Sequence, residues 1–145
     1  MNYEILEHDH IVELIDLYIE AFNAPPWHDK WTQDTVFNRL SQMMNCEGAY
    51  GLVAYKDEKV VGMILGNHEY YYDGMQFQIK EFCVDHKLKG EGIGSKLFDE
   101  FLGRLKERGI GEVILLTSRT EKTEGFYNKR GFESYNHMTL MGKKI

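Results

Sequence analysis

The chain has 145 residues, of which 43% are hydrophobic and 13% aromatic, and a formal net charge of −6. The length predicts one domain over residues 1–145, and the aromatic content argues against disorder. The acidic balance disfavours a nucleic-acid partner, because neutralising phosphates requires a basic surface, and mildly favours a cationic substrate.

Membrane, metal and secretion signals are not evident. No run approaches 18 apolar residues, so no membrane span or membrane partner is expected. The first ten residues lack the basic and apolar regions of a signal peptide. Cys46 and Cys83 stand in unrelated contexts and do not form a metal framework. We therefore expect a cytoplasmic, reduced protein without a bound metal.

Hydrophobic periodicity predicts a strand, two helices and a hairpin in the first half of the chain. Asp9 and Thr32 are the expected helix N-caps. Residues 67–74, rich in tyrosine, are expected to form a polar connection. The predicted elements are a strand over Tyr3–Glu7, helices over His10–Phe22 and Thr32–Cys46, and hairpin strands over Ala49–Tyr55 and Lys59–Gly66.

The second half is expected to contain two further strands, two helices and a closing hairpin. Gly109 is the expected C-terminal cap of the longer helix. The predicted elements are a strand over Gln76–Val84, a helix over Ser95–Arg108, a strand over Glu112–Thr117, a helix over Glu121–Arg130, and a hairpin of Phe132–Tyr135 with Met138–Gly142. Consecutive strands followed by strand–helix–strand predict a mixed α/β sheet.

Residues 84–95, V-D-H-K-L-K-G-E-G-I-G-S, join the fourth strand to the long helix and hold three glycines. The first amides of a helix have no internal partners and carry the positive end of its dipole. Glycines leave room for an anion there, so the turn is predicted to bind phosphate. The spacing excludes the dinucleotide fingerprint, because Leu97 stands where its third glycine is required, and the order Gly94-Ser95-Lys96 excludes the P-loop.

This run does fit R/Q-x-x-G-x-G/A, the pyrophosphate loop of the GNAT acetyltransferase superfamily, with Lys89 in place of Arg or Gln. Residues 125–132, G-F-Y-N-K-R-G-F, are close to the second signature of that family, F-Y-x-K-x-G-F. They follow the fifth strand at the customary distance. With both motifs in this order, residues 50–142 resemble a GNAT acetyltransferase.

The resemblance implies a mixed, mostly antiparallel sheet of about six to seven strands, flanked by about four helices. In such a sheet the fourth and fifth strands are parallel and splay apart, and the gap admits the pantetheine arm of acetyl-CoA. Thr117 stands where the family often has Asn. The cofactor-binding residues that the resemblance implies are Phe82, Cys83, Val84, Lys89, Gly90, Glu91, Gly92, Ile93, Gly94, Ser95, Thr117 and Tyr127.

Two side chains are candidates for proton transfer. Glu81 is a charged residue in the apolar strand I-K-E-F-C-V, and the resemblance implies that it accepts the proton of the amine through water. Its alternative is a carboxylate that faces solvent or pairs with a neighbour. Tyr127 is expected to protonate the leaving thiolate, because a phenol has a pKa of about 10 and a thiol about 8.5. Its alternative is an aromatic packed beside Phe126.

The expected acceptor pocket combines residues from several segments: Trp27, Trp31, His68, Tyr71 and Glu81. His68 is the reserve base, and core packing is an equal alternative for the two tryptophans. Tyr71 belongs to a tyrosine run that could face a cation or form a solvated hairpin tip. Main chain near Cys83 and Val84 is implied to stabilise the developing oxyanion, and the Cys83 thiol is expected to be a small buried hydrophobe.

We therefore expect an enzyme that transfers an acetyl group from acetyl-CoA to a primary amine by direct attack in a ternary complex. A small cationic acceptor, resembling an aminoglycoside or a polyamine, is preferred. The alternatives are a protein or peptide acceptor, at its N-terminus or a lysine, and a non-catalytic sensor that binds acyl-CoA. Dimers are common in the family, and a homodimer would be expected to use the C-terminal strands.

Overall fold

A computed structural model describes all 145 residues. The chain forms two compact units, Met1–Leu115 and Leu116–Ile145. The single domain expected from the length stays a prediction. No helix is both long and apolar enough to cross a lipid bilayer.

The first unit contains five strands, three α-helices and two short 3-10 helices. Their order is β1 (Asn2–Ile5), η1 (His8–His10), α1 (Ile11–Phe22), α2 (Gln33–Met44), β2 (Ala49–Lys56), β3 (Lys59–Tyr71), β4 (Gly74–Val84), η2 (His86–Leu88), α3 (Ile93–Glu107) and β5 (Ile110–Leu115). The sheet order is β1-β2-β3-β4-β5, antiparallel except for the parallel pair β4–β5. The mixed α/β class is confirmed, with five strands instead of six or seven.

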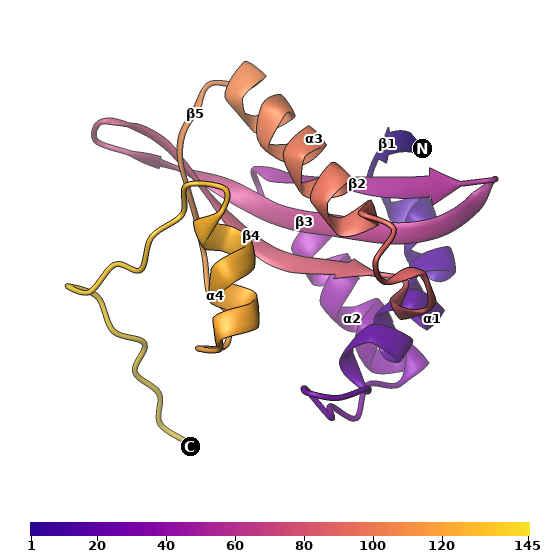
Figure 1. The fold of residues 1–145 in the computed structure, drawn as a ribbon. Helices are drawn as coiled ribbons and strands as arrows, with labels where there is room; N and C mark the ends of the chain where they lie inside the picture. Colours follow the sequence, from indigo (N-terminus) through magenta and orange to yellow (C-terminus); the bar gives the residue numbers. More distant parts are fainter. The chain divides into compact units, whose positions relative to one another are not determined.

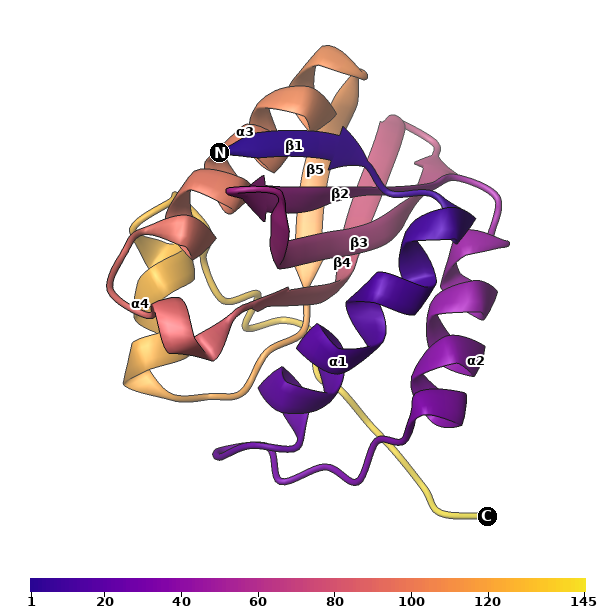
Figure 2. The same cartoon turned by 90° about the vertical axis from the view of Figure 1, so that its right-hand side faces the viewer.

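Helices cover both faces of this sheet. Helices α1 and α2 lie on one face and α3 on the other (Figure 1 and Figure 2). Each helix turns an apolar stripe inward at i, i+3 and i+4 spacing, which in α3 runs from Ile93 to Leu105. Phe101 of α3 is fully buried, and its ring centroid lies 5.7 Å from that of Tyr50 and 5.5 Å from that of Phe77. These contacts attach α3 firmly to β2 and β4.

Two expected local features are wrong. Asp9 does not cap the first helix; Glu7 and His10 instead form a reciprocal cap around η1, which leads directly into α1. Residues 67–74 are not an irregular connection. Strand β3 continues to Tyr71, which pairs with Gly74 at the start of β4. The strands extend because continued pairing satisfies the backbone of both. The Thr32 cap is confirmed: its hydroxyl accepts from the Thr35 amide at 3.2 Å.

The second unit contains one helix, α4 (Glu121–Asn128), which begins at the capping residue Thr120. The closing hairpin expected over residues 132–142 is not formed. Its turn is present, since the Met138 amide donates to the Tyr135 carbonyl at 3.1 Å, but neither flank is a strand. A two-stranded hairpin alone is marginally stable, so the turn by itself does not enforce pairing.

Candidate active site

The glycine-rich turn has the backbone geometry that a phosphate site requires. Gly90 and Gly92 have φ of +88° and +76°, in the left-handed region that favours glycine. A Cβ at either position would meet no atom within 4 Å, so the space beside them is open. The first hydrogen bond of α3 runs from the Lys96 amide to the Gly92 carbonyl, at 3.0 Å. The amides of residues 93–95 come before this first bond. No helical carbonyl therefore accepts a hydrogen bond from them.

Side chains around the turn hold it in place without filling it. Ile93 is buried in the core beneath α3, so only its main chain can face a ligand. Glu91 accepts a hydrogen bond from Lys56 Nζ at 2.6 Å, which ties the turn to the end of β2. Lys89 is exposed beside the turn.

Strand β4 extends past the end of its parallel neighbour. The last pair between them is Ile79 with Leu115, where β5 ends, whereas β4 continues to Val84. The parallel pairing of β4 with β5 is therefore confirmed up to Ile79 and Leu115, and the splaying of the two strands that the resemblance implies stays a prediction. The end of β4 beyond its last pair with β5 lies directly before the glycine-rich turn in sequence, so Phe82–Val84 and the turn belong to one continuous segment.

A bulge in β4 decides which face Glu81 occupies. Opposite β3, Leu65 pairs with Glu81 but Gly66 pairs with Ile79, which leaves Lys80 as the extra residue. Before the bulge, Phe77 faces α3 and contacts Phe101. After it, Phe82 faces α3 and contacts Phe98, so Glu81 points to the opposite face, toward α1 and α2.

On that face Glu81 is paired rather than free. Its carboxylate is only 6% exposed and accepts a hydrogen bond from Arg39 Nε of α2 at 2.5 Å. The hydroxyl of Tyr18 in α1 also acts on this carboxylate and lowers its pKa. Trp31 completes the group: its ring lies 5.2 Å from that of Tyr18, edge to face, and 5.8 Å from the Arg39 guanidinium carbon. We call these four residues the Glu81 cluster.

Burial and charge act in opposite directions on Glu81. Burial raises the pKa of its carboxyl group above the ordinary value, and the charge of Arg39, the hydrogen bond from Arg39 and the nearby Tyr18 hydroxyl offset part of that rise. Burial also raises the pKa of the Tyr18 hydroxyl, with a further rise from the Glu81 charge. A buried carboxyl group with a raised pKa is typical of a proton acceptor in catalysis.

The structure brings some of the expected pocket residues together and leaves others apart. Trp31 and Glu81 belong to one cluster, and Trp27, 41% exposed, adjoins it through Phe22 at 6.2 Å. His68 pairs with Phe77 on the sheet, whereas Glu81 pairs with Leu65. His68 and Leu65 are three residues apart along β3, which separates their positions by about 10 Å. Tyr71 lies further out on the hairpin and is 62% exposed.

Cys83 lies on the same face as Glu81 and packs into the core formed with α1. Its thiol is buried, and burial raises its pKa, with a further rise from the Glu81 charge. A thiol that resists ionisation is a poor nucleophile. This environment favours the small buried hydrophobe that the sequence indicated, so Cys83 would serve a ligand through its main chain.

Tyr127 belongs to the second unit. Its ring packs against Phe126 and Phe132, with centroids 5.2 and 5.9 Å apart, and burial raises the pKa of its hydroxyl. Thr117 also lies in this unit and is exposed. The roles expected for both residues stay predictions.

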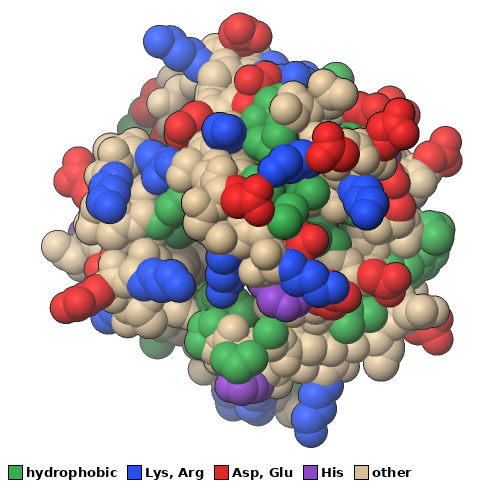
Figure 3. All heavy atoms as spheres, turned by 45° about the vertical axis from the view of Figure 1, so that its right-hand side comes forward, with side chains coloured by type: hydrophobic (Ala, Val, Ile, Leu, Met, Phe, Trp, Pro, Cys, Tyr) green, Lys and Arg blue, Asp and Glu red, His purple; other side chains and the backbone are tan.

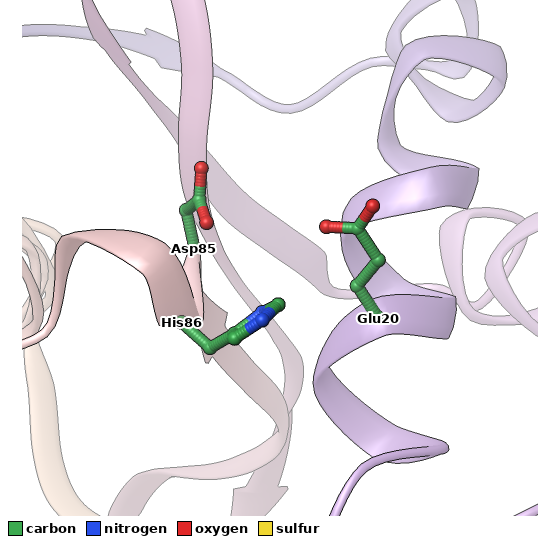
Figure 4. Close-up of side chains that lie close together, drawn as sticks. All are labelled: Glu20, Asp85 and His86. Atoms are coloured by element: carbon green, nitrogen blue, oxygen red, sulfur yellow. The ribbon is translucent and has the colours of Figure 1, made fainter.

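One further group of metal-ligand side chains lies near the turn. Glu20 of α1 faces Asp85 and His86, and their ligand atoms lie within 4.8 Å of one another (Figure 4). The carboxylate of Asp85 already accepts from the Lys87 amide at 2.9 Å. Glu20 and His86 are exposed, and exposed groups of this kind are common without an ion. The expectation that no metal is bound stays a prediction.

Sequence reasoning missed Arg39, although a signal for it exists. Val36, Arg39, Leu40 and Met43 follow i, i+3, i+4 and i+7 spacing, so a lone cation stands beside the buried stripe of α2. Glu81 is likewise a lone anion in an apolar strand. Charges at such positions are expected to pair, because burying either one alone is costly.

Comparison with known proteins assigns the family. The family model for the acetyltransferase (GNAT) domain matches residues 18–140. The chain therefore belongs to the GNAT acetyltransferase family, which confirms the resemblance drawn from its two motifs. A search of curated proteins by sequence finds no significant match.

Solved structures share the fold at low sequence identity. A ribosomal-protein-alanine N-acetyltransferase from Brucella melitensis biovar Abortus 2308 is 16% identical, with a TM-score of 0.78, over 99% of this chain and 100% of that one. A possible acetyltransferase from Clostridium difficile 630 is 14% identical, with a TM-score of 0.84, over 99% and 97%. An aminoglycoside acetyltransferase from an uncultured soil metagenomic sample, in complex with sisomicin, is 19% identical, with a TM-score of 0.71, over 99% and 95%.

Proposed function

We propose that this protein transfers the acetyl group of acetyl-CoA to a primary amine of a small cationic molecule, with both substrates bound together. The observation that carries the proposal is the open turn at the start of α3, where Gly90 and Gly92 adopt left-handed conformations beside unobstructed space. A turn of this kind, at the positive end of a helix, suits the pyrophosphate of coenzyme A.

The residues present fit that cofactor. The amides within residues 89–95, chiefly those of residues 93–95 at the start of α3, would hold the pyrophosphate, with Lys89 close enough in sequence to add a positive charge. The main chain of Phe82–Val84, beyond the end of β5, would hold the pantetheine arm. Bound acetyl-CoA would supply the acetyl group as an activated thioester.

Two side chains of this protein would move the protons. Glu81 would take a proton from the amine through a water molecule, because its own carboxylate is buried. Tyr127 would return a proton to the leaving sulfur, because a phenol with an ordinary pKa of about 10 is protonated at neutral pH and so has a proton to give. His68 stays the reserve base.

The preference for a small cationic acceptor is supported by charge. The net charge of −6 favours the approach of a cation. Acidic and basic side chains are interspersed over the face in Figure 3, which shows no continuous basic surface for nucleic acid. One structural neighbour is an aminoglycoside acetyltransferase in complex with sisomicin. Another is a ribosomal-protein-alanine N-acetyltransferase, so a protein N-terminus is the second candidate acceptor.

The direct test is turnover with a panel of amines. The protein is incubated with acetyl-CoA and aminoglycosides, polyamines, or peptides with free N-termini and lysines, and the free thiol is followed. We expect thiol release with the cationic small molecules. Release with peptides alone would reject the proposed acceptor and support the second candidate.

The variant Tyr127→Phe distinguishes an enzyme from a non-catalytic sensor that binds acyl-CoA. An enzyme should lose turnover by a factor of about 10² or more, far more than it loses affinity for coenzyme A, whereas a sensor should change in neither. The matched control is Tyr135→Phe, on a half-exposed tyrosine of the same unit with no expected role. A wild type that binds coenzyme A but releases no thiol with any amine would support the sensor.

A further inference from the structure

The buried side chain of Glu81 is paired with a cation from another element of the first unit. Arg39 comes from α2 and Glu81 from β4, and their Nε and Oε1 atoms lie 2.5 Å apart. The Glu81 side chain is 6% exposed, whereas that of Arg39 is 40% exposed. The pair therefore joins a buried anion to a cation that still reaches solvent.

The surroundings of Glu81 contain few other charges. The titratable groups that act on it are Arg39 from α2, Tyr18 from α1 and Asp29 from the segment between these helices, and Cys83 lies beside it on its own strand. Asp29 is an anion and works against ionisation of Glu81. Arg39 is thus the cation that compensates the burial of this carboxylate.

Arg39 is itself held in position. Its guanidinium carbon lies 5.8 Å from the centroid of Trp31, within the range of a cation–π contact. Trp31 is fixed by two hydrogen bonds to the Asn23 side chain, of 3.0 and 2.9 Å through its own carbonyl and amide. A third bond, of 3.0 Å, runs from its indole nitrogen to Asp29. The segment between α1 and α2 therefore braces Arg39 against Glu81.

We propose that Arg39 is a positioning residue of the acetyl transfer, which keeps the Glu81 carboxylate ionised and fixed in orientation so that it can receive the proton of the amine. A buried carboxyl group without a cation would hold its own proton at neutral pH and could not act as a base. The proton passes from the amine nitrogen through water to Glu81, and no bond to Arg39 forms or breaks. This inference rests on the proposed function, in which Glu81 is the proton acceptor.

A purely structural ion pair is the competing explanation. Such a pair also joins α2 to β4, and its loss also destabilises the fold. The two explanations predict different effects when Arg39 is removed. Either explanation predicts a raised pKa of Glu81, because Arg39 favours the charged form of that carboxyl group. A positioning role predicts in addition a loss of rate that follows this pKa across the pH range and is absent when Glu81 is already replaced, whereas a structural role predicts a loss of stability without that loss of rate.

The experiment compares Arg39→Gln, Arg39→Lys, Glu81→Gln and the double variant Arg39→Gln/Glu81→Gln with the wild type. Arg104→Gln is the matched control, because Arg104 Nε also donates to a glutamate, Glu100, at 2.8 Å in a partly buried pair, but within α3 and away from Glu81. The readouts are kcat and the KM values for the acceptor and for acetyl-CoA from pH 5 to about 9.5, and the carboxyl resonance of Glu81 in protein labelled with ¹³C-glutamate, assigned by its loss in Glu81→Gln.

For Arg39→Gln we expect kcat at pH 7 to fall about tenfold or more, with partial recovery at high pH, and KM for acetyl-CoA to stay unchanged. The acid limb of the kcat/KM profile and the Glu81 resonance should both titrate at higher pH. Arg39→Lys should fall between this variant and the wild type, and Arg104→Gln should match the wild type. Because Arg39 acts through Glu81, the double variant should be no slower than Glu81→Gln.

Failure of this inference can be told apart from failure of the proposed function. If the wild type acetylates amines but Arg39→Gln leaves both the profile and the Glu81 resonance unchanged, or the losses in the double variant add, the positioning role is overturned. If the wild type acetylates no amine, the proposed function fails, and an unmoved Glu81 resonance in Arg39→Gln then overturns this inference separately. Should Arg39→Gln not fold, Arg39→Lys gives the same decision through its intermediate shift.

Discussion

Gly92→Ala is the sharpest test of the turn at the start of α3, because its two effects can be calculated separately. Gly92 has φ of +76° and ψ of 13°. A residue with a Cβ pays about 1–2 kcal/mol in this region. Alanine recovers about 0.4–1 kcal/mol by restricting the unfolded chain. No atom lies within 4 Å of the new Cβ, so no steric clash is added.

The net loss in the free energy of unfolding should therefore be about 1 kcal/mol. For a chain of this size that corresponds to a fall of about 2–4 °C in Tm. The affinity for coenzyme A should fall much further, by about tenfold or more, because the methyl group enters the space beside the first amides of α3. Both are measured on one preparation, Tm by calorimetry and Kd by titration with coenzyme A.

Gly103→Ala is the matched control within the same helix. Gly103 is exposed in the interior of α3, and a Cβ there also meets no atom within 4 Å. It should gain about 0.5–1 kcal/mol in stability and leave the affinity for coenzyme A unchanged. If Gly92→Ala kept the wild-type Tm, or weakened the binding of coenzyme A no more than Gly103→Ala does, the reasoning about this turn would be refuted.

Three further changes test the core, the sheet and the ionisation of Glu81. Phe101→Ala removes a fully buried ring and should cost about 3–5 kcal/mol in chemical denaturation; a loss below about 1 kcal/mol would contradict the packing of α3. Gly66→Ala would place a Cβ 2.0 Å from the Gln78 carbonyl oxygen and should prevent normal pairing of β3 with β4, seen as a collapse in the yield of folded protein; a wild-type Tm would argue against this register. Because the folded-state pKa of Glu81 lies above its ordinary value of 4.5, its contribution to stability is present at lower pH and is lost as pH rises through the folded pKa. The unfolding free energy of the wild type relative to Glu81→Gln should therefore fall from pH 4.5 upward, and a rise over that range would contradict the assigned direction.

The sequence by itself determined the features that depend on neighbouring residues. The glycine spacing and the amphipathic run after it predicted the start of α3 to within two residues, at Ser95 rather than Ile93, and Gly109 follows the end of that helix with φ of +83°. Thr32 caps α2 as expected, through the Thr35 amide. A charged Glu81 in an apolar strand marked the candidate site. These features depend on backbone conformation and side-chain periodicity within a few residues, so local pattern is sufficient to find them.

Only the tertiary structure decided the features that depend on register and on distant partners. The extra residue at Lys80 turns Glu81 from the α3 side to the side of α1 and α2, and no local pattern indicates that shift. The partnership of Glu81 with Arg39 spans 42 positions in sequence. The C-terminal turn at Tyr135–Met138 forms without the paired strands expected around it. Pairing across a sheet and burial between elements are set by which surfaces meet, and the sequence of one segment does not contain that information.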